Sequence, residues 1–136
     1  MRILDCILLV DDDPASLFIS KKVISNMMIS KNVDFLPDGC KAIQYVEEYQ
    51  SKTHKLPDLI FLDIKMPECD GFDFMNFVNN KYPTLANGVV VLSNSSNVQD
   101  KESMKKLGIK HYMTKPITLD KLGKFLAADS HIPFML

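Results

Sequence analysis

Five polar residues that could do chemistry each follow a stretch typical of a strand. The acids Asp11 and Asp12 come directly after one apolar run, and Asp63 ends another. Ser93 follows a third apolar run, and Lys115 follows a shorter mixed segment. Carboxylates, a hydroxyl and an ammonium group are together the inventory for phosphoryl transfer onto an aspartate.

Three carboxylates at one place repel one another unless a cation lies between them. At an effective dielectric constant of about 20, two carboxylates 4 Å apart repel by roughly 4 kcal/mol. Mg²⁺ suits such a site because it binds a few carboxylates, keeps several waters and accepts phosphate oxygens. We therefore expect Mg²⁺ at Asp11, Asp12 and Asp63, with Ser93 and Lys115 binding an anion beside it.

The strands that would deliver these residues fall into two kinds. Continuous apolar runs at residues 6–10, 59–62 and 89–92 are typical of strands buried on both faces. The mixed segments 32–36 and 109–113 are typical of half-exposed edge strands. The sequence therefore predicts three central strands and two edges.

Helical segments alternate with these strands. We predict helices over residues 15–28, 41–50, 72–78, 98–107 and 118–128. Asp13 is a candidate N-cap for the first helix and Thr118 for the last. The fourth helix has few apolar residues, so we expect it to be docked loosely.

Alternation of strands and helices predicts a parallel sheet, because parallel strands need crossover connections. Placing the apolar strands inside gives a doubly wound (βα)5 fold of the flavodoxin-like kind, with strand order 2-1-3-4-5. All carboxyl ends then lie at one edge of the sheet, where ligands bind in such folds. The five polar residues should therefore converge on one site.

Composition narrows the class of protein. With 136 residues the chain is expected to form one domain. A net charge of −1 gives no broad electrostatic case for nucleic acid or an anionic membrane. The apolar runs fall short of the roughly 20 residues that span a bilayer, and the N-terminus lacks the apolar core of a signal peptide. We expect a cytoplasmic protein without nucleic-acid or membrane partners.

Cysteine usage points the same way. Cys6, Cys40 and Cys69 are odd in number and lack CxxC spacing, which indicates neither a disulfide framework nor a zinc site. We therefore expect three free thiols in a reducing cytosol, with Cys69 an incidental loop residue. The three histidines are scattered and do not indicate a metal site.

Four motifs with a specific joint spacing extend over nearly the whole chain. They are Leu9-Val10-Asp11-Asp12, Leu62-Asp63-Ile64-Lys65-Met66-Pro67 with Asp70-Gly71, Leu92-Ser93, and Lys115-Pro116. This pattern resembles the receiver domain of two-component response regulators. The resemblance implies that Asp63 accepts a phosphoryl group from a histidine kinase or a histidine phosphotransfer protein.

The same resemblance assigns roles around Asp63. It implies that Asp12, Asp63 and the backbone carbonyl of Lys65 ligate Mg²⁺, while Asp11 acts mainly through water. It implies that Ser93 and Lys115 bind the phosphoryl oxygens.

Further positions follow from the family pattern. Tyr112 matches the aromatic switch residue, which would turn inward when Ser93 moves towards a phosphoryl group. The bond between Lys115 and Pro116 should be cis. Lys65 and Ser95 occupy the positions that tune phosphoryl lifetime, and Lys65 could cover the phosphoryl group or pair with Glu68.

The expected organisation is a receiver domain over residues 1–128 and a short tail, 129–136, with no output domain. We expect a signalling protein that promotes its own phosphorylation and dephosphorylation rather than an enzyme with a separate substrate. Its output would be a protein partner on the face made by the fourth helix, fifth strand and fifth helix. Four lysines make this region basic: Lys101, Lys105, Lys106 and Lys121.

Two alternatives stay open at the level of sequence. One is a pseudo-receiver that only binds partners, against which the complete set of acids, hydroxyl and lysine argues. The other is a phosphatase of the haloacid-dehalogenase type, since Asp11 and Asp13 after an apolar strand resemble that nucleophile motif. That alternative leaves the Asp63 strand unexplained, and the chain lacks an obvious cap domain.

Overall fold

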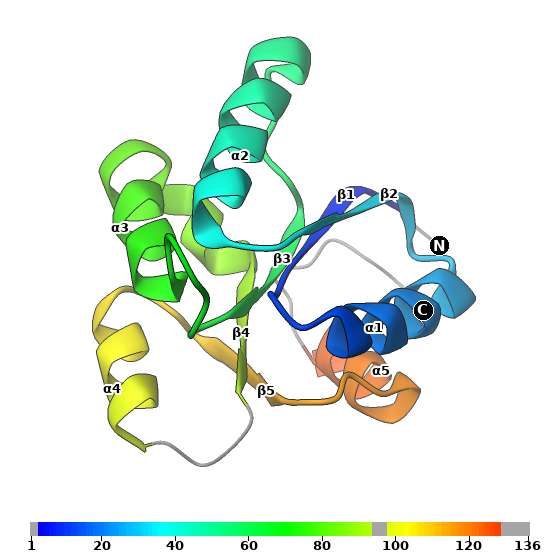
Figure 1. The fold of residues 1–136 in the computed structure, drawn as a ribbon. Helices are drawn as coiled ribbons and strands as arrows, with labels where there is room; N and C mark the ends of the chain where they lie inside the picture. The colour runs from blue at the N-terminus through cyan, green and yellow to red at the C-terminus, as the bar shows by residue number, and fades with distance from the viewer. Residues whose placement is uncertain (1–2, 94–97, 129–136) are drawn as a thin grey trace.

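The computed structural model describes residues 3–93 and 98–128. Five parallel strands form one sheet in the order β2-β1-β3-β4-β5, which confirms the predicted order (Figure 1). The strands are β1 (Leu4–Val10), β2 (Ser30–Leu36), β3 (Leu59–Asp63), β4 (Val89–Ser93) and β5 (His111–Thr114).

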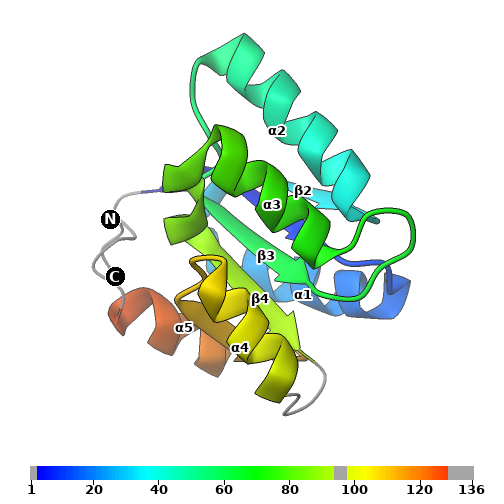
Figure 2. The same cartoon turned by 90° about the vertical axis from the view of Figure 1, so that its left-hand side faces the viewer.

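Helices cover both faces of the sheet. One face carries α1 (Pro14–Met27) and α5 (Leu119–Ala128). The other carries α2 (Gly39–Thr53), α3 (Gly71–Lys81) and α4 (Val98–Lys106), which lie in front of the sheet in Figure 2. The structure adds a short 3₁₀ helix, η1 (Pro83–Gly88), that the sequence did not predict. Each face has its own apolar core cluster between sheet and helices.

Burial separates the strands as their patterns predicted. Every residue of β3 and β4 is buried, whereas β2 is partly exposed along its length. A run without polar alternation can be buried on both faces, and a mixed run cannot. α4 buries only Met104, in agreement with the loose docking expected from its composition.

Two predicted helix starts are confirmed. The backbone N–H of Ala15 donates to Oδ1 of Asp13 at 3.0 Å, and that of Lys121 donates to Oγ1 of Thr118 at 3.1 Å. Such caps satisfy N–H groups that have no partner within the helix. Over the described ranges, no helix combines the length and apolar character needed to cross a bilayer.

The expectation of three free thiols was wrong. Cys40, in the first turn of α2, is paired in a disulfide with Cys69 in the loop between β3 and α3, with their Cα atoms 5.1 Å apart. Cys6 on β1 is free and buried. The pairing depends on the tertiary approach of two segments 29 residues apart, which motif spacing does not reveal. Cysteine spacing therefore no longer supports a reducing compartment.

Candidate functional site

The register of the sheet brings the predicted polar residues to one edge. Val10 pairs with Leu62 across β1 and β3, so Asp11 and Asp63 each follow a member of the same pair. On the other side, the backbone N–H of Lys115 donates to the carbonyl of Ser93 at 2.8 Å, which extends the β4–β5 pairing by one residue. Strand ends in register thus place residues that are distant in sequence beside one another.

Lys115 joins the two buried carboxylates of this site. Its Nζ lies 2.9 Å from Oδ2 of Asp11 and 3.2 Å from Oδ2 of Asp63. The exposed fractions of the three side chains are 10% for Lys115, 2% for Asp11 and 12% for Asp63. An ammonium group between two desolvated carboxylates holds both in place, and Asp63 is the more accessible of the two.

Electrostatics at the site follow from burial. Burial raises the pKa of Asp63 to about 6, an effect that the Lys115 charge opposes and the Asp11 charge reinforces. Burial lowers the pKa of Lys115, but the hydrogen bond to Asp11 and the negative charge of Asp63 raise it by more. The net effect is a raised pKa for Lys115. Lys115 therefore stays an ammonium cation.

The site also has the donor set for a divalent cation. Asp11, Asp12 and Asp63 each offer a carboxylate oxygen, and these oxygens lie within 4.8 Å of one another. Asp12 is exposed, whereas the other two are buried. An all-oxygen set that leaves room for water fits Mg²⁺.

Ser93 supplies an unused hydroxyl. Its Oγ is buried and makes no hydrogen bond with any described residue. Among the described residues this hydroxyl is therefore left to donate to a bound acceptor. Ser93 also lines a pocket of about 240 Å³, together with Asp63 and Lys115.

The start of α4 adds side chains that the sequence did not assign to the site. Asp100 and Lys101, from the first turns of α4, line the same pocket, and Asp13 does so beside its capping role. In the sequence, the only indication for Asp100 and Lys101 is that they follow Ser93 by seven and eight positions. That spacing does not say whether the helix turns back over the pocket.

A closed loop between β3 and α3 forms one wall. The backbone N–H of Gly71 donates to the carbonyl of Ile64 at 2.7 Å, and Glu68 within the loop has a left-handed φ of 66°. A Cβ added to Gly71 would lie 2.7 Å from the carbonyl oxygen of Asp63, so only glycine allows this approach. Lys65, inside the loop, lines the pocket.

The remaining predicted positions lie as follows. Tyr112 on β5 is half-buried, and its hydroxyl donates to the carbonyl of Lys101 on α4 at 3.0 Å. The bond between Lys115 and Pro116 is cis, as predicted. Ser95 and the tail 129–136 fall outside the described residues.

Solved structures and curated relatives resemble this chain closely. The phosphorylated cyanobacterial phytochrome response regulator RcpA superposes with a TM-score of 0.73 and 30% identity, over 90% of this chain and 89% of that one. The probable methanogenesis regulatory protein FilR2 of Methanothrix harundinacea is 25% identical over 118 residues, 87% of this chain and 76% of the relative.

Other relatives are longer. The probable C4-dicarboxylate response regulator DctR of Halalkalibacterium halodurans is 29% identical over 117 residues, which are 85% of this chain but 47% of the relative. The model of the response regulator receiver domain matches residues 7–127, and the matched region contains every residue of the acidic pocket described above. The chain therefore belongs to the response regulator receiver domain family.

Proposed function

We propose that Asp63 accepts a phosphoryl group from the phosphohistidine of a histidine kinase or histidine phosphotransfer protein. The observation that carries this proposal is the contact of one largely buried ammonium, Lys115, with both Asp63 and Asp11. Membership of the receiver family supports a phosphoacceptor role in two-component signalling. The related RcpA is described as phosphorylated.

The transfer step uses the groups around Asp63. An oxygen of its carboxylate attacks phosphorus, the phosphorus–nitrogen bond of phosphohistidine breaks, and the histidine leaves. Charge on the transferred group is spread over its three oxygens. Lys115 can bind one of them as a cation, and the hydroxyl of Ser93, which no other described residue binds, can donate to another.

Magnesium fits the same pocket. Asp12, Asp63 and the backbone carbonyl of Lys65 would hold the ion, with Asp11 acting mainly through water. Bound Mg²⁺ neutralises negative charge on the carboxylates and on phosphoryl oxygens. Three carboxylates and one ammonium carry a net charge of −2, which a divalent cation balances.

The alternatives are less favoured by the geometry. For a phosphatase of the haloacid-dehalogenase type, Asp11 would be the nucleophile. Its Oδ1 accepts the backbone N–H of Asp13 at 3.0 Å, its Oδ2 faces Lys115, and its side chain is nearly inaccessible. For a pseudo-receiver, no phosphoryl chemistry would occur, yet Ser93, which lines the pocket, keeps a buried hydroxyl that no other described residue binds.

We propose that the signal is passed to a partner at the α4-β5-α5 face. Tyr112 on β5 bonds to α4 through the Lys101 carbonyl, so a change at Ser93 can reach α4 through Tyr112. The lysines of this region suit a downstream partner with an acidic surface. We place the receiver domain at residues 1–128, and we place its exchange with the kinase in the cytoplasm.

The acceptor is tested by Asp63→Asn, which keeps the side-chain shape and removes the nucleophilic carboxylate. Protein with Mg²⁺ and a small phosphoryl donor, or beryllofluoride, is analysed for the modified carboxylate. We expect modification at Asp63 in the unmodified chain and none in Asp63→Asn. Modification at Asp11 would support the phosphatase alternative, and no modification in either protein would support the pseudo-receiver.

A further inference from the structure

A disulfide cross-links the loop that forms one wall of the acidic pocket, and it has no part in the proposed phosphoryl transfer. It joins Cys40 at the start of α2 to Cys69, six residues after Asp63. The Cα separation of 5.1 Å lies within the usual range for disulfides. We propose that Cys40 and Cys69 form a reversible redox pair whose state sets the mobility of the β3–α3 loop at the pocket.

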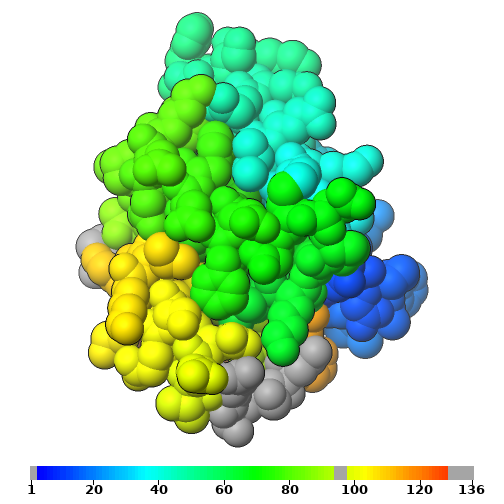
Figure 3. Space-filling view, turned by 60° about the vertical axis from the view of Figure 1, so that its left-hand side comes forward, coloured from blue at the N-terminus to red at the C-terminus, as the bar shows by residue number. Residues whose placement is uncertain are grey.

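Contacts independent of sulfur keep the two cysteines adjacent. The backbone N–H of Gly39 donates to the carbonyl of Cys69 at 2.8 Å. A Cβ added to Gly39 would lie 2.8 Å from the carbonyl oxygens of both Cys69 and Asp70, so the two backbones touch. Figure 3 shows the green loop against the cyan start of α2. After reduction the two sulfurs therefore remain near each other, and the pair can close again.

The pair is accessible to small thiols, unlike the third cysteine. Cys40 is exposed and Cys69 is half-buried. Cys6 is buried, and that burial raises its pKa to about 11, so its reactive thiolate is scarce. Exchange at a disulfide requires access for an attacking thiolate. Redox chemistry is thereby confined to one pair.

The reductant is a low-molecular-weight thiol such as glutathione. Its thiolate attacks Sγ of Cys40, the bond to Cys69 breaks, and Cys69 leaves as a thiolate that takes up a proton. A second small thiolate attacks the mixed disulfide, which frees Cys40 and releases the oxidised disulfide of the small thiol. Two small thiols are oxidised, and one protein disulfide becomes two thiols. The oxidised small disulfide drives the reverse reaction.

The loop that the disulfide restrains is a wall of the pocket. It carries Lys65, which lines the pocket, and begins one residue after Asp63. The cross-link lies between two capped helix starts: Asp38 caps α2, and Asp70 forms a capping box with Asp73 at the start of α3. Reduction leaves the loop held to α2 by the Gly39–Cys69 hydrogen bond and packing alone. We expect greater loop mobility, and hence easier entry of water towards Asp63.

The effect on the phosphoryl group rests on the proposed function, whereas the redox chemistry does not. The chain is equilibrated in glutathione buffers of different ratios, then trapped by alkylation and analysed by mass spectrometry. We expect Cys40 and Cys69 to change together while Cys6 stays unmodified in the folded protein. A pair that remains oxidised at every ratio would be a fixed structural cross-link, which overturns the proposal.

Two further measurements test the coupling to the pocket. Hydrogen exchange of the amides of residues 64–70 should be faster in the reduced protein, and decay of the phosphorylated protein should be several-fold faster. Cys40→Ser should match the reduced protein at every glutathione ratio, and the control Cys6→Ala should keep the redox response. Equal exchange in both redox states would refute the coupling. Absence of phosphorylation in both states would instead refute the proposed function. The glutathione titration and the hydrogen exchange would still show whether Cys40 and Cys69 form a reversible redox pair that controls loop mobility.

Discussion

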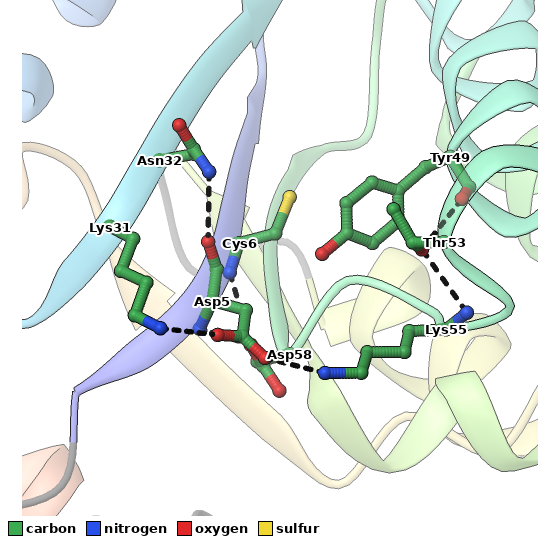
Figure 4. Close-up of polar contacts among 8 residues, drawn as sticks. All are labelled: Asp5, Cys6, Lys31, Asn32, Tyr49, Thr53, Lys55 and Asp58. Atoms are coloured by element: carbon green, nitrogen blue, oxygen red, sulfur yellow. Dashed lines mark hydrogen bonds and ion pairs between the residues drawn. The ribbon is translucent and has the colours of Figure 1, made fainter.

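Lysines and aspartates meet at both ends of the sheet, but in different surroundings. At the carboxyl ends, Lys115 contacts two aspartates and its side chain is only 10% exposed. At the amino ends, Lys31 and Lys55 reach Asp5 from opposite sides, at 3.5 and 3.3 Å, with side chains 68% and 65% exposed (Figure 4). The residue types and distances are similar, and water access differs.

The difference shows how burial changes the acidity of a carboxyl group beside a lysine. In the acidic pocket, burial raises the pKa of Asp63. At the amino ends, the hydrogen bond from Lys55 is the main cause of a lowered pKa for Asp5. Water screens this exposed group, so it contributes little beyond orientation. Asp58 nearby has a structural role, since its Oδ2 accepts the backbone N–H groups of Asp5 and Cys6 at 2.7 and 3.1 Å.

Removing one lysine at each end gives the largest expected contrast. Lys115→Met keeps the length of the side chain but leaves Asp11 and Asp63 facing each other without a cation. We expect a loss of unfolding free energy on the order of 3 kcal/mol in urea without Mg²⁺, the scale for breaking a buried ion pair. Lys55→Met is the matched control and should change stability little. Equal losses in the two variants would contradict the comparison.

The next largest expected difference between the carboxyl and amino ends of the sheet is in Mg²⁺ affinity. Asp12→Ala removes an exposed carboxylate from the metal set. We expect titration calorimetry to show Mg²⁺ affinity reduced by about 100-fold or more, since even outer-shell partners contribute roughly 10–100-fold. Stability without metal should hold or rise, because repulsion is relieved. Asp5→Ala should leave Mg²⁺ affinity unchanged, and unchanged affinity in Asp12→Ala would exclude Asp12 as a ligand.

The hydroxyl of Ser93 tests whether the acidic pocket passes a signal to Tyr112. Ser93→Ala should still be phosphorylated, yet the ring signals of Tyr112 should no longer shift on phosphorylation. The reason is that only the phosphorylated state offers Ser93 an acceptor to move towards, which would leave space for Tyr112 to turn inward. Nuclear magnetic resonance provides the readout. Ser103→Ala, at an exposed position of α4, is the control and should retain the shift. A normal Tyr112 shift in Ser93→Ala would refute this route.

The smallest effect concerns phosphoryl lifetime. Lys65 lines the pocket and can cover the approach of water to the phosphoryl group. Lys65→Asn should speed hydrolysis a few-fold, because a carboxamide can bond an attacking water without covering it. First-order decay with excess Mg²⁺ is the measurement, and Lys55→Asn at the other end of the sheet should decay like the unmodified chain. Equal or slower decay in Lys65→Asn would mean that this lysine points to solvent.

Much of the fold could be predicted because the strands differ in burial. Continuous apolar runs belong inside a sheet covered on both faces, and mixed runs belong at its edges. That rule yielded the observed order of all five strands. It also placed Asp11, Asp63, Ser93 and Lys115 at one edge, because parallel strands share the direction of their carboxyl ends.

Other parts of the site could not be predicted, because they depend on contacts between elements. Asp100 lines the pocket because the start of α4 lies near the strand ends that carry Asp63 and Ser93. The hydroxyl of Tyr112 donates to the carbonyl of Lys101 on α4 at 3.0 Å and to that of Ile109, two residues before β5, at 3.4 Å.

The sequence by itself determined which residues lie at the carboxyl edge. The apolar pattern of each segment marks the strands, and the helices between them make the strands parallel, so their carboxyl ends lie together. The tertiary structure alone decided the pairing of Cys40 with Cys69. That pairing requires the start of α2 and the β3–α3 loop to touch through backbone atoms, with Gly39 leaving the space. The spacing of residues along the chain does not indicate this approach, because the approach arises from how α2 and α3 pack on the same sheet.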